Sequence, residues 1–105
     1  MSNEWKSLNS SYIIFLKGEN MDDKTLIIYA YVTASSYRVR TMKAINTQVL
    51  NPTNIAKKSD IKTNHISKVL KELCDKKLAI CINEEAKKNR MYKLTNSGLE
   101  ILGEL

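Results

Sequence analysis

Residues 51–95 decide the fold of this chain of 105 residues: NPTNIAKKSDIKTNHISKVLKELCDKKLAICINEEAKKNRMYKLT. The segment opens with helix-start signals, because Asn51 can cap a helix and Pro52 suits the first helical position, where a missing N–H costs nothing. Ser59 and Asp60 then favour a turn, since their side chains compete for backbone groups. We therefore predict a short helix that begins at Pro52 and ends at a tight turn.

A longer helix is expected after this turn, with Thr63 as its N-cap. Its apolar residues recur at a spacing that places them on one face: Ile66, Val69, Leu70, Leu73 and Cys74. The opposite face carries short polar and charged side chains: Asn64, His65, Ser67, Lys68, Lys71 and Asp75. A helix with one buried face and one face of this kind fits the major groove of DNA.

Two short apolar segments after this helix predict a two-stranded ribbon. The first segment alternates in the period-two pattern of a half-buried strand, with Leu78, Ile80 and Ile82 on one side and Ala79 and Cys81 on the other. The returning strand is supplied by Met91, Tyr92 and Leu94. Between the strands lies a polar tip, NEEAKKNR, which carries Lys87, Lys88 and Arg90.

The segment resembles the winged helix-turn-helix of small archaeal and bacterial transcription regulators of the MarR-like and ArsR-like families. The matching residues are PTNIAKKSDI, KTNHISKVLKELCDKKL, AICINEEAKKNRMYKLT and TNSGLEIL, and the resemblance covers residues 35–105. It implies a mainly α fold with a small β-hairpin (α+β), in which a three-helix core carries a wing and terminal helices. The family usually has glycine before the first wing strand, where this chain has Lys77. Lys77 must therefore adopt a left-handed helix end at a cost, or the helix ends differently.

The expected domain organisation follows from this resemblance. Residues 1–22 form an N-terminal extension, and residues 23–105 form the winged-helix domain. Within that domain the helix-turn-helix covers residues 51–77, the wing residues 78–95 and the C-terminal helix residues 96–105. In the extension, residues 12–17 (YIIFLK) are apolar and could form an added strand. The aromatic residues of the extension could pack against a partner subunit or against their own core: Trp5, Tyr12 and Phe15.

Two further helices are expected before the helix-turn-helix. Asp22 and Asp23 can cap a helix that begins at Lys24. Residues 26–32 of this helix, LIIYAYV, could equally form a buried strand because they are rich in β-branched and aromatic side chains; we predict a helix. A second helix over residues 37–46 is expected to point Val39, Met42 and Ile45 inward and Arg38, Arg40 and Lys43 outward.

Apolar surface at both ends of the domain suggests an interface between subunits. Thr95 is expected to cap a last helix, which contains Leu99, Ile101, Leu102 and Leu105. Together with residues 26–32, this helix offers more apolar surface than a three-helix core can cover. We expect a homodimer formed through the N-terminal and C-terminal helices. The alternative is that the two terminal helices bury each other within one subunit.

The positive charge of the chain gathers in the helix-turn-helix and wing. Residues 52–93 hold 11 Lys and Arg against 5 Asp and Glu, a balance of +6, whereas the rest of the chain holds 6 of each. A run of charge is usually a solvated face. Its coincidence with this motif instead favours binding to a phosphate backbone, where counterion release supplies affinity.

The composition argues against several other classes of protein. With 43% hydrophobic and 27% charged residues the chain is typical of globular domains. No apolar run approaches the length of a membrane span, and no signal-peptide pattern opens the chain. Two cysteines without a pair-like spacing point to a reducing, cytoplasmic setting. One histidine, three glycines and no phosphate-binding loop argue against an enzyme and imply no cofactor.

The two cysteines are explained by packing. Cys74 falls on the inner face of the second helix, and Cys81 lies in the half-buried strand. A metal site would need further ligands, and His65 lies on the opposite face of the helix. A thiol that senses oxidation would need exposure and a lowered pKa, which the sequence does not supply.

The sequence therefore predicts a sequence-specific double-stranded DNA-binding transcriptional regulator. Asn64 can pair with adenine and Lys68 can reach guanine acceptors, whereas His65 can contact a base edge or a phosphate and Thr63 a thymine methyl group or a phosphate. The spacing does not decide which of them reads a base. Residues expected to contact phosphates are Lys57, Lys58, Lys62, Ser67 and Lys71. At the wing, Lys87, Lys88 and Arg90 are expected to approach the flanking backbone or minor groove, with Arg90 foremost because narrow minor grooves attract Arg.

The alternative is a winged-helix protein–protein interaction module in a transcription machinery or another assembly. Such a module would expose apolar residues on the second helix, whereas this face carries Asn64, His65, Ser67 and Lys68. The polar face favours DNA. RNA ranks third, because the aromatic side chains on which single-strand readers stack bases are absent from this face.

Overall fold

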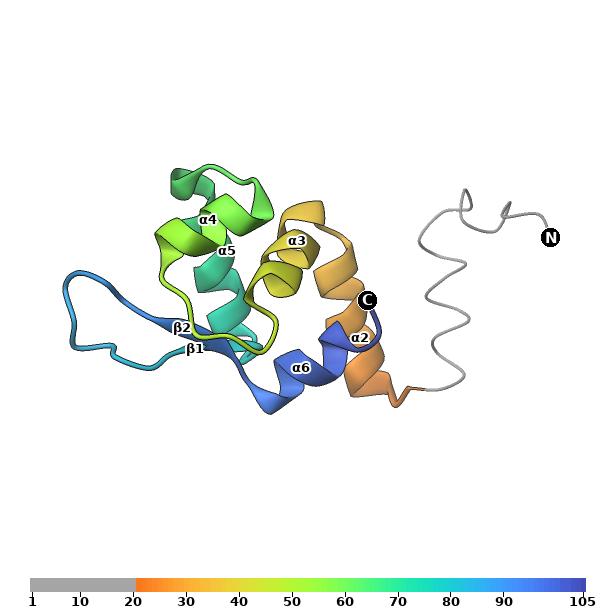
Figure 1. Cartoon of the computed structure of the whole chain (residues 1–105). Coiled ribbons are helices and arrows are strands. Elements are labelled where there is room, and N and C mark those ends of the chain that lie inside the picture. Colours follow the sequence, from red (N-terminus) through yellow and green to blue (C-terminus); the bar gives the residue numbers. More distant parts are fainter. Residues whose placement is uncertain (1–20) are drawn as a thin grey trace. The chain divides into compact units, whose positions relative to one another are not determined.

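The computed structural model describes residues 21–105 (Figure 1). The chain divides between Ser35 and Ser36 into two units, and each is described by itself. The strand expected over residues 12–17 and the packing expected of Trp5, Tyr12 and Phe15 lie outside the described residues. No helix within residues 21–105 has the length and apolar character needed to cross a membrane.

The first unit contributes helix α2, Asp23–Thr33. Asp22 is its N-cap, and its carboxylate accepts a hydrogen bond from the backbone N–H of Thr25 at 2.7 Å. This bond favours the charged carboxylate and so lowers the pKa of Asp22 below its usual value. Because residues 26–32 lie within α2, the expected helix is confirmed and the strand alternative is excluded.

The second unit has the element order expected for a winged helix. The elements are α3 (Ser36–Ile45), α4 (Pro52–Ser59), α5 (Thr63–Asp75), β1 (Ala79–Cys81), β2 (Tyr92–Leu94) and α6 (Asn96–Leu102). In Figure 1 α3, α4 and α5 group together, and the loop between β1 and β2 projects away from them. The predicted class, mainly helical with one small antiparallel hairpin, is confirmed.

Helix α4 begins and ends where its local signals place it. The side chain of Asn51 accepts a hydrogen bond from the backbone N–H of Asn54 at 2.8 Å, and Pro52 occupies the first turn. At the other end Asp60 takes a left-handed conformation with φ 57°. The N–H of Ile61 then bonds back to the carbonyl of Ala56 at 3.1 Å. These bonds make the tight turn that separates α4 from α5.

Helix α5 begins one residue earlier than expected. Its N-cap is Lys62, which has extended backbone angles and makes no side-chain cap bond, and Thr63 is the first helical residue. The predicted Thr63 cap is therefore wrong. Ile61 is buried beneath the turn, and helical geometry resumes at Thr63, after the single extended residue Lys62. Tertiary packing of the turn thus outweighs the local preference of a threonine hydroxyl for the cap position.

Lys77 ends α5 in the left-handed conformation that glycine usually supplies, with φ 60°. The N–H of Lys77 bonds to the carbonyl of Cys74 at 2.9 Å, and the N–H of Leu78 bonds to the carbonyl of Leu73 at 2.9 Å. This bond pair is the Schellman motif. Of the two possibilities in the sequence, Lys77 therefore adopts the left-handed helix end and accepts its steric cost.

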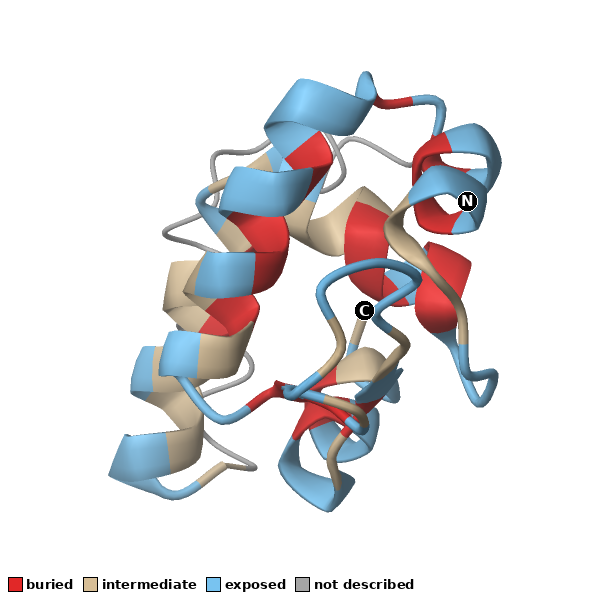
Figure 2. Ribbon diagram, turned by 90° about the vertical axis from the view of Figure 1, so that its left-hand side faces the viewer, coloured by how far each residue is buried: buried red, intermediate tan, exposed pale blue. Residues whose placement is uncertain are grey.

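The core of the second unit lies between α3, α4, α5 and the hairpin. Its largest fully buried side chains are Met42, Ile45, Ile55, Ile66, Leu70, Leu73 and Leu78. Figure 2 shows buried residues on the facing sides of the helices and exposed residues on their outer sides. The apolar face predicted for α5 is confirmed for Ile66, Val69, Leu70 and Leu73, and Cys74 is half-buried.

Helix α3 differs from expectation in its polar residues. Met42 and Ile45 are buried as predicted, but Val39 is only half-buried. Arg38 and Arg40, expected to point outward, are partly buried. Arg38 lies 3.4 Å from the carboxylate of Glu72 on α5. The pattern of apolar residues could not reveal this, because arginine buries its long apolar stem while its charged end reaches a partner.

The wing is a short antiparallel hairpin that pairs Ala79 with Leu94, Ile80 with Lys93 and Cys81 with Tyr92. Of the alternating residues, Leu78, Ala79 and Cys81 are buried, whereas Ile80 and Ile82 face solvent. A bridge missed by the sequence analysis joins Leu50 to Tyr92 through two backbone hydrogen bonds of 3.0 Å and 2.8 Å. The segment before α4 thereby holds the outer edge of β2.

Helix α6 follows the wing directly. Thr95 is its N-cap, as predicted, and accepts a hydrogen bond from the N–H of Gly98 at 3.1 Å. The helix ends at Leu102, so the helix expected over residues 96–105 was three residues too long. The last residues instead continue as turns, with the N–H of Glu104 bonded to Ile101 and that of Leu105 to Leu102.

Candidate nucleic-acid interface

The outer face of α5 presents an exposed set of polar and cationic side chains. Because Ile66, Val69, Leu70 and Leu73 pack inward, the residues between them point to solvent. The structure brings together on this exposed face Lys62, Thr63, Asn64, His65, Ser67, Lys68 and Lys71. They include hydrogen-bond donors and acceptors suited to base edges and cations suited to phosphates.

The expected α4 lysines differ in their surroundings. Lys57 and Lys58 are both exposed, but the ammonium of Lys58 donates a hydrogen bond to the side-chain oxygen of Gln48 at 2.7 Å. Lys57 instead borders a shallow hollow of about 440 Å³ at the start of α5, together with Lys62 and His65. Asp60 and Tyr37 complete the polar rim of this hollow.

Two α3 residues that the sequence analysis did not select contribute to the helix-turn-helix. The guanidinium of Arg40 donates from Nε and Nη2 to the carbonyl of Ser59, at 3.1 Å and 2.7 Å, and from Nη2 to the carbonyl of Asp60. Its positive charge therefore lies at the carboxyl end of α4, where cations are favourable. No local signal identifies this role, because the partners lie 19 and 20 residues away.

Tyr37 lies between the Arg40 guanidinium and His65, one of the DNA-binding candidates on α5. Its ring centroid is 5.4 Å from the guanidinium carbon of Arg40 and 5.7 Å from the ring centroid of His65, with the two rings tilted by 59°. These distances match cation–π and edge-to-face contacts. His65 is therefore held by an aromatic neighbour from another helix.

The wing tip has an internal scaffold of its own. The side-chain oxygen of Asn83 accepts from the N–H of Met91 at 2.7 Å, and its amide donates to the carbonyl of Asn89 at 3.1 Å. Lys87 and Lys88 are exposed at this tip. Arg90 is exposed as well, but its guanidinium donates to the carbonyls of Ala86 at 2.9 Å and Glu84 at 3.0 Å. Arg90 thus shapes the loop, which leaves the two lysines as its leading outward cations.

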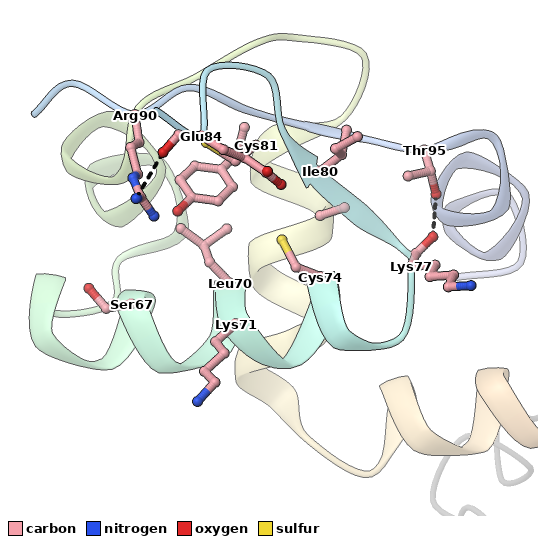
Figure 3. Close-up of a pocket in the computed structure, with 12 residues that line it drawn as sticks. Ser67, Leu70, Lys71, Cys74, Lys77, Ile80, Cys81, Glu84, Arg90 and Thr95 are labelled. Carbon is pink, nitrogen blue, oxygen red and sulfur yellow. Dashed lines mark hydrogen bonds between the residues drawn. The ribbon is translucent and has the colours of Figure 1, made fainter. Parts of the chain in front are cut away.

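A groove of about 890 Å³ separates α5 from the wing (Figure 3). Leu70 and Cys74 point from α5 toward the strands, while the side chain of Lys71 points away from the groove. The lining residues are Ser67, Leu70, Lys71, Cys74, Lys77, Ala79, Ile80, Cys81, Glu84, Arg90, Tyr92 and Thr95. The floor is mainly apolar, and the charged groups lie toward its edges. Lys71 is thereby directed outward, as a phosphate contact requires.

The two thiols line the same groove. Burial raises the pKa of the Cys74 thiol above its usual value, and unfavourable electrostatic interactions of a Cys74 thiolate with the Cys81, Asp75 and Glu84 side chains act in the same direction. A raised pKa lowers the fraction of reactive thiolate. Within residues 21–105 no group of three or more His, Cys, Asp and Glu side chains lies close enough to hold a metal ion.

Solved structures with the same fold are transcription regulators. No family model and no curated relative matches the chain. The structure resembles MepR of S. aureus in complex with DNA, with 18% identity and a TM-score of 0.61 over 89% of this chain and 76% of that one. A MarR family transcriptional regulator from Silicibacter pomeroyi matches with 14% identity and a TM-score of 0.58, covering 90% and 71%. NadR in complex with 4-hydroxyphenylacetate matches with 15% identity and a TM-score of 0.58, covering 92% and 70%. At these identities the likeness shows the winged-helix fold of the MarR regulators.

Proposed function

We propose that this winged-helix chain is a double-stranded DNA-binding transcription regulator. Helix α5 enters the major groove, and the wing tip with Lys87 and Lys88 lies on the flanking backbone or minor groove. The proposed function is DNA binding, without catalysis of a reaction. The MepR–DNA complex supports this proposal, because MepR has the same fold and is bound to DNA.

The observation that carries the proposal is the two-faced character of α5. Its inner face is buried in the core, and its outer face exposes Asn64, His65 and Lys68 in the first two turns. In helix-turn-helix proteins the N-terminal part of the second helix reaches the base edges. Asn64 can bond two groups of adenine, and Lys68 can donate to guanine acceptors. Their exposure on a helix whose axis is fixed by packing is what sequence-specific binding requires.

The positioning contacts surround this reading face. We assign Lys57, Lys58, Lys62, Ser67 and Lys71 to phosphates, with Thr63 at a thymine methyl group or a phosphate. Arg90 stays in the proposed interface through the shape that it gives to the wing tip. Contacts of this kind set register and affinity but carry no sequence information. They also account for the location of the excess positive charge in residues 52–93.

The proposed regulator acts as a homodimer through its N-terminal and C-terminal helices. A two-fold dimer would place two α5 helices about 34 Å apart, one turn of DNA, and would bind a pseudo-palindromic site. Ile27 of α2 has 67% of its surface exposed and Leu99 of α6 has 37%, which supports apolar surface on both helices. Sedimentation equilibrium of the full chain tests this assembly, and a monomer at micromolar concentration would contradict it.

Two sets of substitutions test the division between reading and positioning. Asn64→Ala and Lys68→Ala should each cost about 1–3 kcal/mol at the preferred site and should relax preference at one position of that site. Lys87→Ala combined with Lys88→Ala should weaken binding to all sequences and reduce the salt slope by about two. Affinity is measured by fluorescence anisotropy on selected and random duplexes across a salt series.

The control removes two exposed lysines outside the proposed DNA and dimer contacts, Lys43 on α3 and Lys76 at the end of α5. It changes net charge as much as the wing pair does, so it should reduce affinity far less if contacts rather than total charge matter. If the α5 substitutions and the wing pair weakened binding to every DNA sequence in the same way, the proposed roles of reading and positioning would be contradicted. Equal effects of the wing pair and the control pair would contradict a wing contact.

A further inference from the structure

Three side chains from α3 and α5 form a continuous chain of contacts. Arg40 is fixed at one end by its hydrogen bonds to the carbonyls of Ser59 and Asp60 at the end of α4. The Tyr37 ring lies 5.4 Å from that guanidinium, and the His65 ring lies 5.7 Å from Tyr37. Three hydrogen bonds to backbone carbonyls hold the Arg40 guanidinium. Tyr37 lies between Arg40 and His65.

The exposure of these three side chains increases from Arg40 to His65. Arg40 is partly buried, Tyr37 has 37% of its surface exposed, and His65 is exposed on the outer face of α5. These three contacting side chains therefore lead from the interior of the helix-turn-helix to the proposed reading face. An exposed histidine without such a neighbour would sample several rotamers and would lose that freedom on binding.

We propose that Tyr37 is a positioning residue for DNA recognition: fixed against Arg40, it holds the His65 imidazole in the orientation that meets the DNA. This role rests on the proposed function, since it needs α5 to contact DNA. Pre-ordering a side chain reduces the cost of association. Loss of the Tyr37 ring should therefore weaken specific binding by roughly two- to tenfold.

The surroundings of His65 leave Tyr37 as its structural partner. The hollow next to it is lined by Tyr37, Lys57, Asp60, Lys62 and His65 together with apolar groups of Ala56 and Ile61. The Asp60 backbone carbonyl in this hollow is already bonded to Arg40. Within residues 21–105, the aromatic contact with Tyr37 is the interaction that holds the His65 ring.

The first test is made on the free protein. His65 is the only histidine of the chain, so its imidazole carbon-bound protons give isolated NMR signals. Tyr37→Leu removes the ring current and should move these signals toward those of an unstructured histidine. Tyr37→Phe keeps the ring and should leave them close to the wild-type positions, and Lys43→Ala on the same helix should leave them unchanged. Unmoved signals in Tyr37→Leu would overturn the proposal.

The second test is a double-mutant cycle on DNA binding with the full chain. Tyr37→Leu should weaken binding to the selected site by the stated factor in the wild-type background and have no further effect in His65→Ala, and Tyr37→Phe should restore binding. Low salt keeps the weaker variants measurable. Equal losses in both backgrounds would overturn the positioning role, because Tyr37 would then act independently of His65. Thermal unfolding of each variant verifies that it is folded at the assay temperature.

Failure of the proposed function gives a different result. If the wild-type chain binds no duplex at low salt, the DNA role of Tyr37 falls with the function itself. The NMR shift in Tyr37→Leu would still be present, because it reports the contact in the free protein. The combination of DNA binding, an NMR shift and coupling between Tyr37 and His65 supports the proposal.

Discussion

Gly98 provides a sharp test of how α6 is joined to the wing. A methyl group on its Cα would lie 2.0 Å from the carbonyl oxygen of Leu78 and 3.2 Å from the Cβ of Leu94. The Leu78 carbonyl cannot rotate away, because it also accepts the N–H of Thr95 at 3.0 Å. Gly98→Ala therefore forces α6 away from the start of β1.

The cost can be assembled from the contacts that this movement disturbs. Overpacking in a well-packed region costs about 1–3 kcal/mol. Weakening the Thr95 N–H bond to Leu78 and the 2.6 Å bond from the Thr95 hydroxyl to the Lys77 carbonyl adds about 0.5–1.5 kcal/mol each. The higher helix propensity of alanine returns about 1 kcal/mol. We expect a net loss of about 1–5 kcal/mol, or roughly 5–25 °C in Tm for a domain of this size.

Gly103→Ala is the matched control, because it makes the same chemical change at the end of the same helix. Gly103 has φ −61°, and a methyl group there would meet its nearest atom, the carbonyl oxygen of Glu100, at 3.4 Å. This variant should be neutral or more stable by up to about 1 kcal/mol. Both are measured by urea and thermal unfolding followed by circular dichroism. If the two variants agree within about 0.5 kcal/mol, the close approach of α6 to the wing is refuted.

Three further predictions concern stability. Lys77→Gly should stabilise the protein by about 0.5–1 kcal/mol in urea unfolding, because glycine avoids the left-handed strain at φ 60° but loses more chain entropy; a loss of stability would contradict the Schellman geometry. Thr41→Val should raise stability by about 1 kcal/mol, since the fully buried Thr41 hydroxyl has no hydrogen-bond partner among residues 21–105; destabilisation would show that the hydroxyl is satisfied. The lowered pKa of Asp22 means that its cap contributes above the unfolded-state pKa and is lost as pH falls through the lower folded-state pKa. The stability gap between wild type and Asp22→Ala should therefore be present at pH 7 and shrink below about pH 4, and a gap independent of pH would contradict this.

Local signals predicted those parts of the fold that depend on neighbouring residues. Asn51 and Thr95 cap their helices as expected, because each cap bond joins residues three apart. Spacing alone identified the buried face of α5. Thr63 failed as a cap although its residue type is suitable. The packing of Ile61 beneath the turn set the start of the helix instead.

Contacts between distant residues could not be predicted in this way. Arg40 has the sequence context of a solvated helix residue, yet its partners are carbonyls at the end of another helix. The Leu50–Tyr92 bridge likewise joins a linker to a strand 42 positions later. Arg90 has the composition expected of a groove contact, but a bend of its own loop supplies carbonyls within reach. These roles depend on three-dimensional proximity, which one sequence does not encode locally.

The candidate site was predictable where exposure follows from helix periodicity. Asn64, His65 and Lys68 are exposed as the two-faced pattern of α5 requires. The contribution of Tyr37 was not predictable, because its ring meets His65 only once α3 and α5 have packed. The proposed reading face thus follows from the sequence, whereas the support behind it follows from the fold.

The most direct test of the central claim is to measure binding of the full chain to random-sequence duplex DNA by fluorescence anisotropy across a salt series. The proposed interface predicts binding at low salt. The logarithm of Kd should rise linearly with the logarithm of the salt concentration, because the lysine and arginine side chains release counterions condensed on the DNA when they bind. Selection from the same duplex pool should then yield a preferred site. No binding even at the lowest salt would contradict DNA recognition by α5 and would favour a winged-helix module that binds another protein.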